Sequence, residues 1–161
     1  MKYLQRRRGE GGEEGFTLIE LMVVVLIIAI LIAIAIPTFL GAQNRSRDRS
    51  AQSNLRNALT AAKTIATDRD GFFLKDATNP IDAATLSGVE PGLSFSDTAV
   101  STTGPIGVVT AAGGANITLY NKSGSGSFFC ISSTSNGVVT YKKGSAASDV
   151  NTAALCNGTA W

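Results

Sequence analysis

The chain has 161 residues, of which 44% are hydrophobic and 16% are charged, and its formal net charge is +2. This charge does not favour nucleic-acid binding as the main function, because chains that bind nucleic acids are usually more basic. The sequence contains no histidine, which removes the commonest general base and the commonest zinc ligand of proteins. It also lacks the G-x-S-x-G, P-loop, G-x-G-x-x-G and H-E-x-x-H motifs, so we expect no enzymatic activity, no cofactor and no metal site.

The first 15 residues, MKYLQRRRGEGGEEG, are polar. Lys2 and the three arginines at positions 6–8 precede a long apolar segment. This excess of positive charge predicts that the N-terminal end stays in the cytoplasm and that the C-terminal part lies across the membrane.

The apolar segment extends from Phe16 to Leu40 and contains sixteen consecutive apolar residues between Leu21 and Ile36. As a helix, its 25 residues would be about 37 Å long, enough to cross a hydrocarbon core about 30 Å thick. Glu20 lies at the start of this segment. A carboxylate in hydrocarbon costs roughly 2.5–3.5 kcal/mol on insertion scales, so Glu20 is expected to have a partner.

The helical pattern continues beyond Pro37 and Gly41, although both residues weaken a helix. Apolar residues then recur at spacings of three and four, as on one face of an amphipathic helix: Ala51, Leu55, Ala58, Ala62 and Ile65. A separate basic stripe contains Arg45, Arg49, Arg56 and Lys63. We predict one long helix from about Thr17 to Thr67, bent near Pro37 and Gly41. The sequence DRDG then ends it, and its Gly71 suits a left-handed cap.

Residues 72–115 are rich in glycine, proline, serine, threonine and alanine, which predicts a loop region with one short strand near residues 108–110. Three runs typical of β-strands follow, at residues 116–120, 127–132 and 137–143. The short turn sequences between these runs predict an antiparallel meander. The tail from Gly144 to Trp161 shows no periodicity.

Two cysteines, Cys130 and Cys156, lie in the C-terminal half. If this half is outside the cytoplasm, a disulfide is the simplest interpretation. It would close a loop of about 25 residues and connect the tail to the strand that carries Cys130. A pair of free buried thiols is the alternative.

Two conventional interpretations of the N-terminus stay open. A secretory signal peptide would be cleaved near FLGAQ, residues 39–43, whereas an ordinary single-span anchor would not be cleaved. The polar region before the apolar segment is long for a signal peptide, and neither interpretation gives Glu20 a role.

The sequence GFTLIELMVVVLIIAILIAIAIPTF, residues 15–39, resembles the class III signal and N-terminal helix of bacterial type IV pilins and pseudopilins. The resemblance implies that a prepilin peptidase cleaves between Gly15 and Phe16 and methylates the new amine of Phe16. It also implies that Glu20 pairs with this amine on a neighbouring subunit, and that the helix loses regularity near Pro37 in assembled fibres. Further along the chain, the resemblance is limited to the architecture.

The implied fold class is α+β, with a long N-terminal helix, transmembrane in its first half, packed on a small antiparallel sheet as in the pilin fold. The implied segments are a leader peptide (1–15), a transmembrane and assembly helix (16–41), an amphipathic half of the helix (42–70) and a head with a C-terminal disulfide loop (71–161). The implied location is the inner membrane, with the N-terminus in the cytoplasm, before assembly into an extracellular filament. The implied partners are other pilin subunits, the prepilin peptidase, the pilus assembly platform and its cytoplasmic ATPase.

Three functions from different classes are compatible with these features. The first is a pilin of a type IV pilus used for adhesion, twitching motility or DNA uptake. The second is a pseudopilin of a type II secretion system, and the third is a secreted or membrane-anchored globular binding domain. The basic stripe gives DNA binding only weak support, because Asp48 is interleaved with it and a solvated or subunit-pairing helix face is the commoner meaning of such a pattern.

Overall fold

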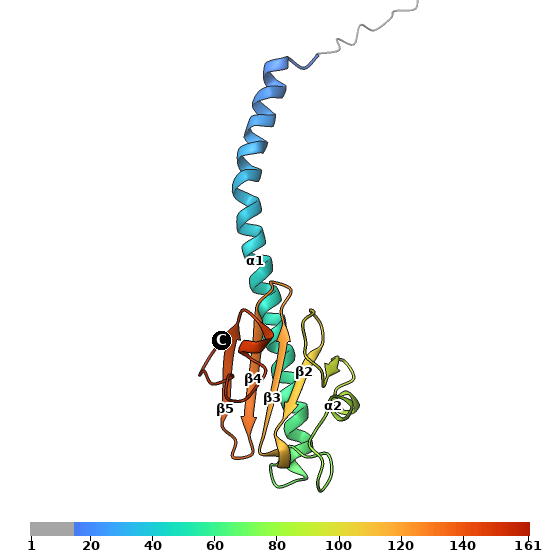
Figure 1. Cartoon of the computed structure of the whole chain (residues 1–161). Coiled ribbons are helices and arrows are strands. Elements are labelled where there is room, and N and C mark those ends of the chain that lie inside the picture. The colour runs from blue at the N-terminus through green and yellow to red at the C-terminus, as the bar shows by residue number, and fades with distance from the viewer. Residues whose placement is uncertain (1–14) are drawn as a thin grey trace, which may run out of the picture. The chain divides into compact units, whose positions relative to one another are not determined.

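The computed structural model describes residues 15–161, so most of the predicted leader, with Lys2 and the arginines at 6–8, lies outside the described residues. The chain divides into two compact units, Met1–Leu40 and Gly41–Trp161. Helix α1 (Leu18–Thr67) contributes to both units. The second unit adds helix α2 and a five-stranded sheet (Figure 1).

Helix α1 begins and ends where the sequence predicts, within one residue at its start. Pro37 lies inside it, and the predicted bend at that point stays a prediction. At its C-terminal end, Asp70 and Gly71 both have positive φ angles, 53° and 86°. The Gly71 N–H donates to the Ala66 carbonyl at 3.0 Å, a bond typical of the Schellman motif that ends many helices. The predicted left-handed stop in DRDG is confirmed, and the left-handed conformation begins one residue earlier, at Asp70.

The three predicted strands are confirmed as β3 (Asn116–Lys122), β4 (Phe128–Thr134) and β5 (Val139–Gly144). A fourth strand, β2 (Ile106–Thr110), pairs with β3 in the antiparallel sense, so that β2 to β5 form one antiparallel meander. Strand β2 begins two residues before the short strand expected at 108–110. The sheet is not purely antiparallel, because the two-residue strand β1 (Phe95–Ser96) pairs with β2 in parallel.

The prediction that residues 72–115 form a loop was wrong at strand β1 and also at α2 (Ala83–Val89), which forms a short helix. Asp82 is its N-cap, and its carboxylate accepts a hydrogen bond from the Thr85 N–H at 2.9 Å. The hydrogen bonds from Lys75 and Thr85 lower the pKa of Asp82 to about 2. A helix of two turns contains too few residues to show the period of 3.6, and the composition of residues 72–115 favours a loop.

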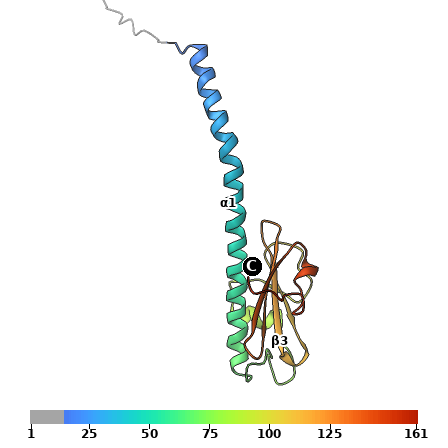
Figure 2. The ribbon, with the colours of Figure 1, turned by 90° about the vertical axis from the view of Figure 1, so that its left-hand side faces the viewer.

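One face of the sheet packs against the second half of α1. All members of the predicted apolar stripe belong to this core, with Ala51, Leu55, Ala58 and Ala62 buried and Ile65 partly buried. Alternating apolar residues of the central strands join the same core, including Leu119, Phe129 and Ile131. Figure 2 shows residues 41–67 of α1 running along this face. The alanines on the helix leave room for the larger side chains of the strands.

The opposite face of the sheet is covered by the C-terminal tail. Alternate residues of β3 and β4 point to this side. They form a second buried cluster with the tail and with Val100 of the segment before β2; its other members are Tyr120, Phe128, Cys130, Val150 and Cys156. The tail then crosses the outer edge of β5, where the Tyr141 N–H donates to the Gly158 carbonyl at 2.8 Å. Trp161 returns to the helix side and packs on the first core. The sheet is therefore covered on both faces.

Candidate processing and assembly site

The predicted cleavage site lies in an open segment before α1. Gly15, Phe16 and Thr17 have no regular secondary structure. The Phe16 side chain is 84% exposed, and no atom of residues 15–161 lies within 4 Å of the position that a Cβ on Gly15 would take. The Gly15–Phe16 peptide bond is therefore exposed in an irregular stretch, as a peptidase substrate requires. Cleavage there and methylation of Phe16 stay predictions.

Thr17 and Glu20 form a capping box at the start of α1. Thr17 Oγ1 accepts a hydrogen bond from the Glu20 N–H at 3.3 Å. In return, Glu20 Oε2 accepts hydrogen bonds from the Thr17 N–H at 2.9 Å and from the Thr17 hydroxyl at 2.6 Å. These contacts satisfy N–H groups that the first turn of a helix leaves unpaired. Sequence analysis missed this partner of Glu20, although the T-x-x-E spacing is its known signature.

The capping box satisfies Glu20 only in part. Within residues 15–161, every hydrogen bond to its carboxylate ends on Oε2, which leaves Oε1 available to another donor. The two ion pairs found in this part of the chain, Lys75–Asp82 and Lys143–Asp48, do not involve Glu20. A neutral hydrogen bond does not cancel the charge of a carboxylate, so a cation that approaches Glu20 in an apolar environment would still be stabilised there.

The first half of α1 exposes apolar side chains all round. From Leu18 to Leu40, every residue is exposed, including the branched side chains of Val23, Ile27 and Ile34. Among the described residues, α1 is the one helix long and apolar enough to cross a membrane, and its most apolar 18-residue window has a mean hydropathy of 3.3. A surface of this kind is stable only when lipid or other apolar surfaces cover it.

The helix accommodates Pro37 with help from the next residue. Proline has no N–H to donate and crowds the carbonyl four residues earlier. The Thr38 hydroxyl donates to the Ile34 and Ala35 carbonyls, at 3.2 Å and 2.9 Å. Such side-chain hydrogen bonds to the preceding turn are an alternative to the regular backbone ladder. The predicted loss of regularity near Pro37 in a fibre stays a prediction.

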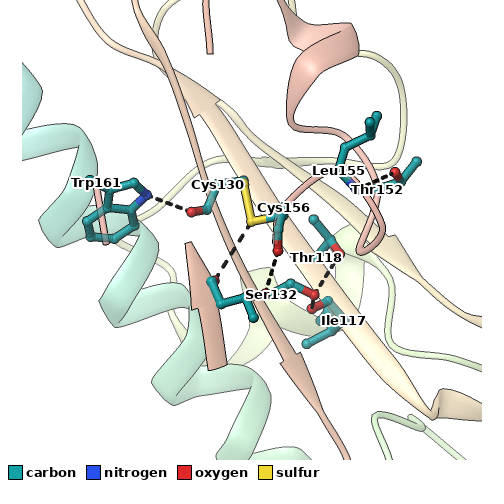
Figure 3. Close-up of a disulfide and its surroundings, with 9 residues drawn as sticks. Ile117, Thr118, Cys130, Ser132, Thr152, Leu155, Cys156 and Trp161 are labelled. Carbon is teal, nitrogen blue, oxygen red and sulfur yellow. Dashed lines mark hydrogen bonds between the residues drawn. A yellow bond between two sulfur atoms is a disulfide. The ribbon is translucent and has the colours of Figure 1, made fainter. Parts of the chain in front are cut away.

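The expected disulfide is present between Cys130 on β4 and Cys156 in the tail. Both cysteines are fully buried. Figure 3 shows the bond beside Trp161, whose indole N–H donates to the Cys130 carbonyl at 2.7 Å. The alternative of two free thiols is thereby excluded, and the tail is attached to the sheet by a covalent bond and by the indole.

The predicted basic stripe lies on the outer side of α1. Arg45, Arg49, Arg56 and Lys63 are all exposed. The Arg56 guanidinium lies 4.8 Å from the centre of the Trp161 ring, so one of the four cations has a structural role in holding the tail. Asp48 turns toward the head and accepts hydrogen bonds from Ser123 and Ser125. DNA binding by the stripe stays a prediction.

Comparisons with known proteins indicate the same kind of protein as the geometry does. The family described as the prokaryotic N-terminal methylation motif matches residues 12–36. The curated type IV major pilin protein PilA of Myxococcus xanthus (strain DK1622) is 45% identical over 82 residues, which are 51% of this chain and 36% of that protein. The matched part thus spans about a third of the length of this relative. No solved structure matches the chain significantly.

These findings agree on the class of the protein. The methylation motif covers the segment that contains Gly15, Phe16 and Glu20. The structure adds a long apolar helix followed by a head in which an amphipathic helix packs on a mostly antiparallel sheet. The motif, the similarity to a type IV major pilin and the fold together support a type IV pilin.

Proposed function

We propose that the mature chain begins at Phe16 and is a structural subunit of a type IV pilus filament. The observation that carries this proposal is the apolar surface of residues 18–40, which is exposed over its whole circumference. This surface needs lipid around it before assembly and neighbouring helices around it afterwards. Both environments are apolar, so the transfer from one to the other has a small free-energy change.

Glu20 would set the alignment of neighbouring subunits. Its Oε1 has no donor within the described chain, and cleavage after Gly15 creates a positively charged amine on Phe16 near the same depth. A neighbouring amine that reaches Glu20 neutralises a carboxylate that is otherwise costly in hydrocarbon. A subunit in the wrong register leaves both charges unpaired, so the unpaired state is selected against.

The location and partners follow from this assembly route. The processed chain would reside in the inner membrane with its N-terminus on the cytoplasmic side and its head outside. The prepilin peptidase would cleave and methylate it, and an assembly platform driven by a cytoplasmic ATPase would extract it into a filament with other pilin subunits. The chain itself would have a structural and not an enzymatic role.

The similarity to a type IV major pilin favours a surface pilus over a pseudopilus. Adhesion, twitching motility and DNA uptake are the uses we propose for such a filament. A pseudopilin would give a secretion defect without surface fibres when deleted. A membrane-anchored or secreted binding domain would give neither, and cleavage as a secretory signal peptide would place its mature start near Gln43.

Substitutions at the capping box test the proposal. Glu20→Gln keeps a side chain that can still complete the box but removes the charge, whereas Glu20→Ala removes both. We expect the two variants to be processed and inserted normally, with surface filaments reduced by roughly tenfold or more, because the ion pair is lost. Thr17→Ser, which keeps the hydroxyl, is the matched control and should assemble as the wild type does. Normal filament yield from Glu20→Gln, measured in material sheared from cells, would refute the role of the charge.

A further inference from the structure

The side chain of Arg45 turns back along α1 toward the apolar segment. Its Nη1 atom lies 3.5 Å from the position that a Cβ on Gly41 would take. Gly41 precedes Arg45 by one helical turn and directly follows Leu40, the last residue of the apolar segment. Side chains on a helix lean toward its N-terminal end, and the missing side chain at Gly41 leaves space for the guanidinium. The charge of Arg45 therefore lies at the level of residue 41.

This positive charge has no counterion in the described part of the chain. Arg45 is exposed, and it takes part in neither of the two ion pairs found within residues 15–161. The one acidic residue between positions 41 and 67 is Asp48. Its carboxylate accepts hydrogen bonds from Ser123 and Ser125 and pairs with Lys143, 3.6 Å away. Arg45 is thus available to an external anion.

The membrane stage of the proposed function gives this charge a defined depth. From Leu18 to Leu40, α1 is about 34 Å long. The hydrocarbon core is about 30 Å thick, and the bilayer is about 40–45 Å thick when the headgroups are included. A helix that starts at the cytoplasmic interface therefore leaves the hydrocarbon before Leu40, and Gly41 falls among the headgroups of the outer leaflet. A guanidinium at that level meets lipid phosphates, which it can bind by two parallel hydrogen bonds.

We propose that Arg45 binds the headgroups of anionic phospholipids in the outer leaflet, and that Gly41 admits its guanidinium to their level. Arg49 lies one turn beyond Arg45 on the same side of α1, about 6 Å further along the axis. This offset is within the screening length of about 8 Å, so Arg49 adds to the attraction. Anionic headgroups are favoured over zwitterionic ones, because a zwitterionic headgroup carries an ammonium group that both arginines repel.

This inference rests on the proposed membrane stage and adds a lipid partner to it. Basic residues directly after a membrane segment are generally attracted to anionic headgroups. The particular feature of this chain is the glycine one turn before Arg45, which lets the charge reach the end of the apolar segment. Contact with the headgroups would fix the depth of α1 before assembly, and extraction into a filament would break it.

The test compares full-length chains in nanodiscs that contain equal amounts of phosphatidylcholine and phosphatidylglycerol. Native mass spectrometry identifies the lipids that the protein retains. Arg45→Gln removes the charge. Lys63→Gln is its matched control, because Lys63 is an exposed cation of the same helix about 34 Å beyond Leu40. Gly41→Leu keeps the charge but fills the space beside the helix, and Gly41→Ala is its control, because a Cβ there makes only an ordinary contact.

The measured quantity is the ratio of retained phosphatidylglycerol to retained phosphatidylcholine. We expect Arg45→Gln to lower this ratio about three- to fivefold and Gly41→Leu to lower it by about twofold or more. Lys63→Gln, which lies several screening lengths from the headgroups, should change it less than about 1.5-fold, and Gly41→Ala should behave as the wild type does. The cations of the leader are the same in all these chains, so the comparison isolates Arg45.

An unchanged ratio in Arg45→Gln, or an equal loss in Arg45→Gln and Lys63→Gln, overturns the proposal. If Arg45→Gln then still reduces the yield of surface filaments, the partner of Arg45 is a neighbouring subunit and not a lipid. An unchanged ratio in Gly41→Leu overturns the role of Gly41. A chain that does not insert into nanodiscs contradicts the membrane stage of the proposed function and this inference together, whereas an inserted chain without lipid preference contradicts this inference alone.

Discussion

The disulfide between Cys130 and Cys156 is expected to supply a large part of the stability of the head. The two residues are separated by 26 positions. In the chain-entropy model, a loop of this length contributes about 3.5 kcal/mol by restricting the unfolded chain. Whole domains have a free energy of unfolding of only about 5–15 kcal/mol. For a unit of this size, the loss corresponds to a decrease of roughly 10–15 °C in Tm.

The structure also indicates where the damage would be confined. The tail that carries Cys156 covers one face of the sheet and then holds Trp161 against α1. Without the disulfide, the remaining direct contacts of the tail include the Tyr141–Gly158 bridge and the bond from the Trp161 indole to the Cys130 carbonyl. We therefore expect the tail to detach before the rest of the sheet unfolds.

The variant for this test is Cys130→Ala with Cys156→Ala, which avoids placing a hydroxyl group in a buried site. Urea unfolding of the full chain in detergent, followed by circular dichroism and by the fluorescence of the single tryptophan, gives the free energy of unfolding. Reduced wild-type protein is the control and should match the variant within about 1 kcal/mol. A loss of stability below about 1 kcal/mol would refute the reasoning, because it would mean that the noncovalent contacts hold the tail alone.

Three further outcomes are expected. Gly107→Ala should destabilise the head by about 1–3 kcal/mol in urea unfolding, because a Cβ there would lie 2.3 Å from Cζ of the buried Tyr120 ring. The control is Gly88→Ala in α2, where a Cβ meets open space, and it should be neutral or stabilising. Equal effects of the two substitutions on the free energy of unfolding would contradict this reasoning. Trp161→Leu should lower the Tm by several degrees, because it removes edge-to-face contacts with Tyr141 and Phe129; a Tm unchanged by calorimetry would show that the indole contributes nothing. The N-cap of α2 should remain intact in mild acid, because the pKa of Asp82 is lowered to about 2. The stabilisation of α2 by the ionised Asp82 carboxylate is present above the ordinary pKa of 3.8 and is lost as the pH falls from 3.8 toward 2. NMR titration of the Thr85 amide should follow that low midpoint, and a midpoint near 4 would argue against the Lys75–Asp82–Thr85 contacts.

The sequence predicts the long elements of the fold well, because their periodicity extends over many residues. The stripe from Ala51 to Ile65 repeats often enough to define a buried face, and all its members belong to the core. The strands around Leu119 and Ile131 are bounded by clear turn residues. The helix α2 and the strand β1 could not be predicted in this way. They are short, and they depend on tertiary contacts such as the bond from the Ala83 N–H to Asp97 at 2.8 Å.

The candidate site shows a different limit. The glycine, the phenylalanine and the glutamate of the processing segment are close in sequence, so their pattern is readable without a structure. Thr17 is harder to recognise as the partner of Glu20, because a carboxylate in an apolar segment suggests a positively charged partner, whereas the T-x-x-E spacing provides a neutral one. The cavity lined by Arg47 and Asn121 combines residues that are far apart in the sequence, and no local pattern joins them. Such a cavity becomes visible only when the sheet is packed on the helix.

The proposed assembly mechanism is tested most directly by the N-terminal sequence and intact mass of this chain, taken from filaments sheared off the cell surface. This mechanism predicts a start at Phe16, one additional methyl group on its amine, and an intact disulfide between Cys130 and Cys156. A start near Gln43, or an unprocessed Met1 found only in membranes, would contradict it. Either of those results would leave the charge of Glu20 without a function in assembly.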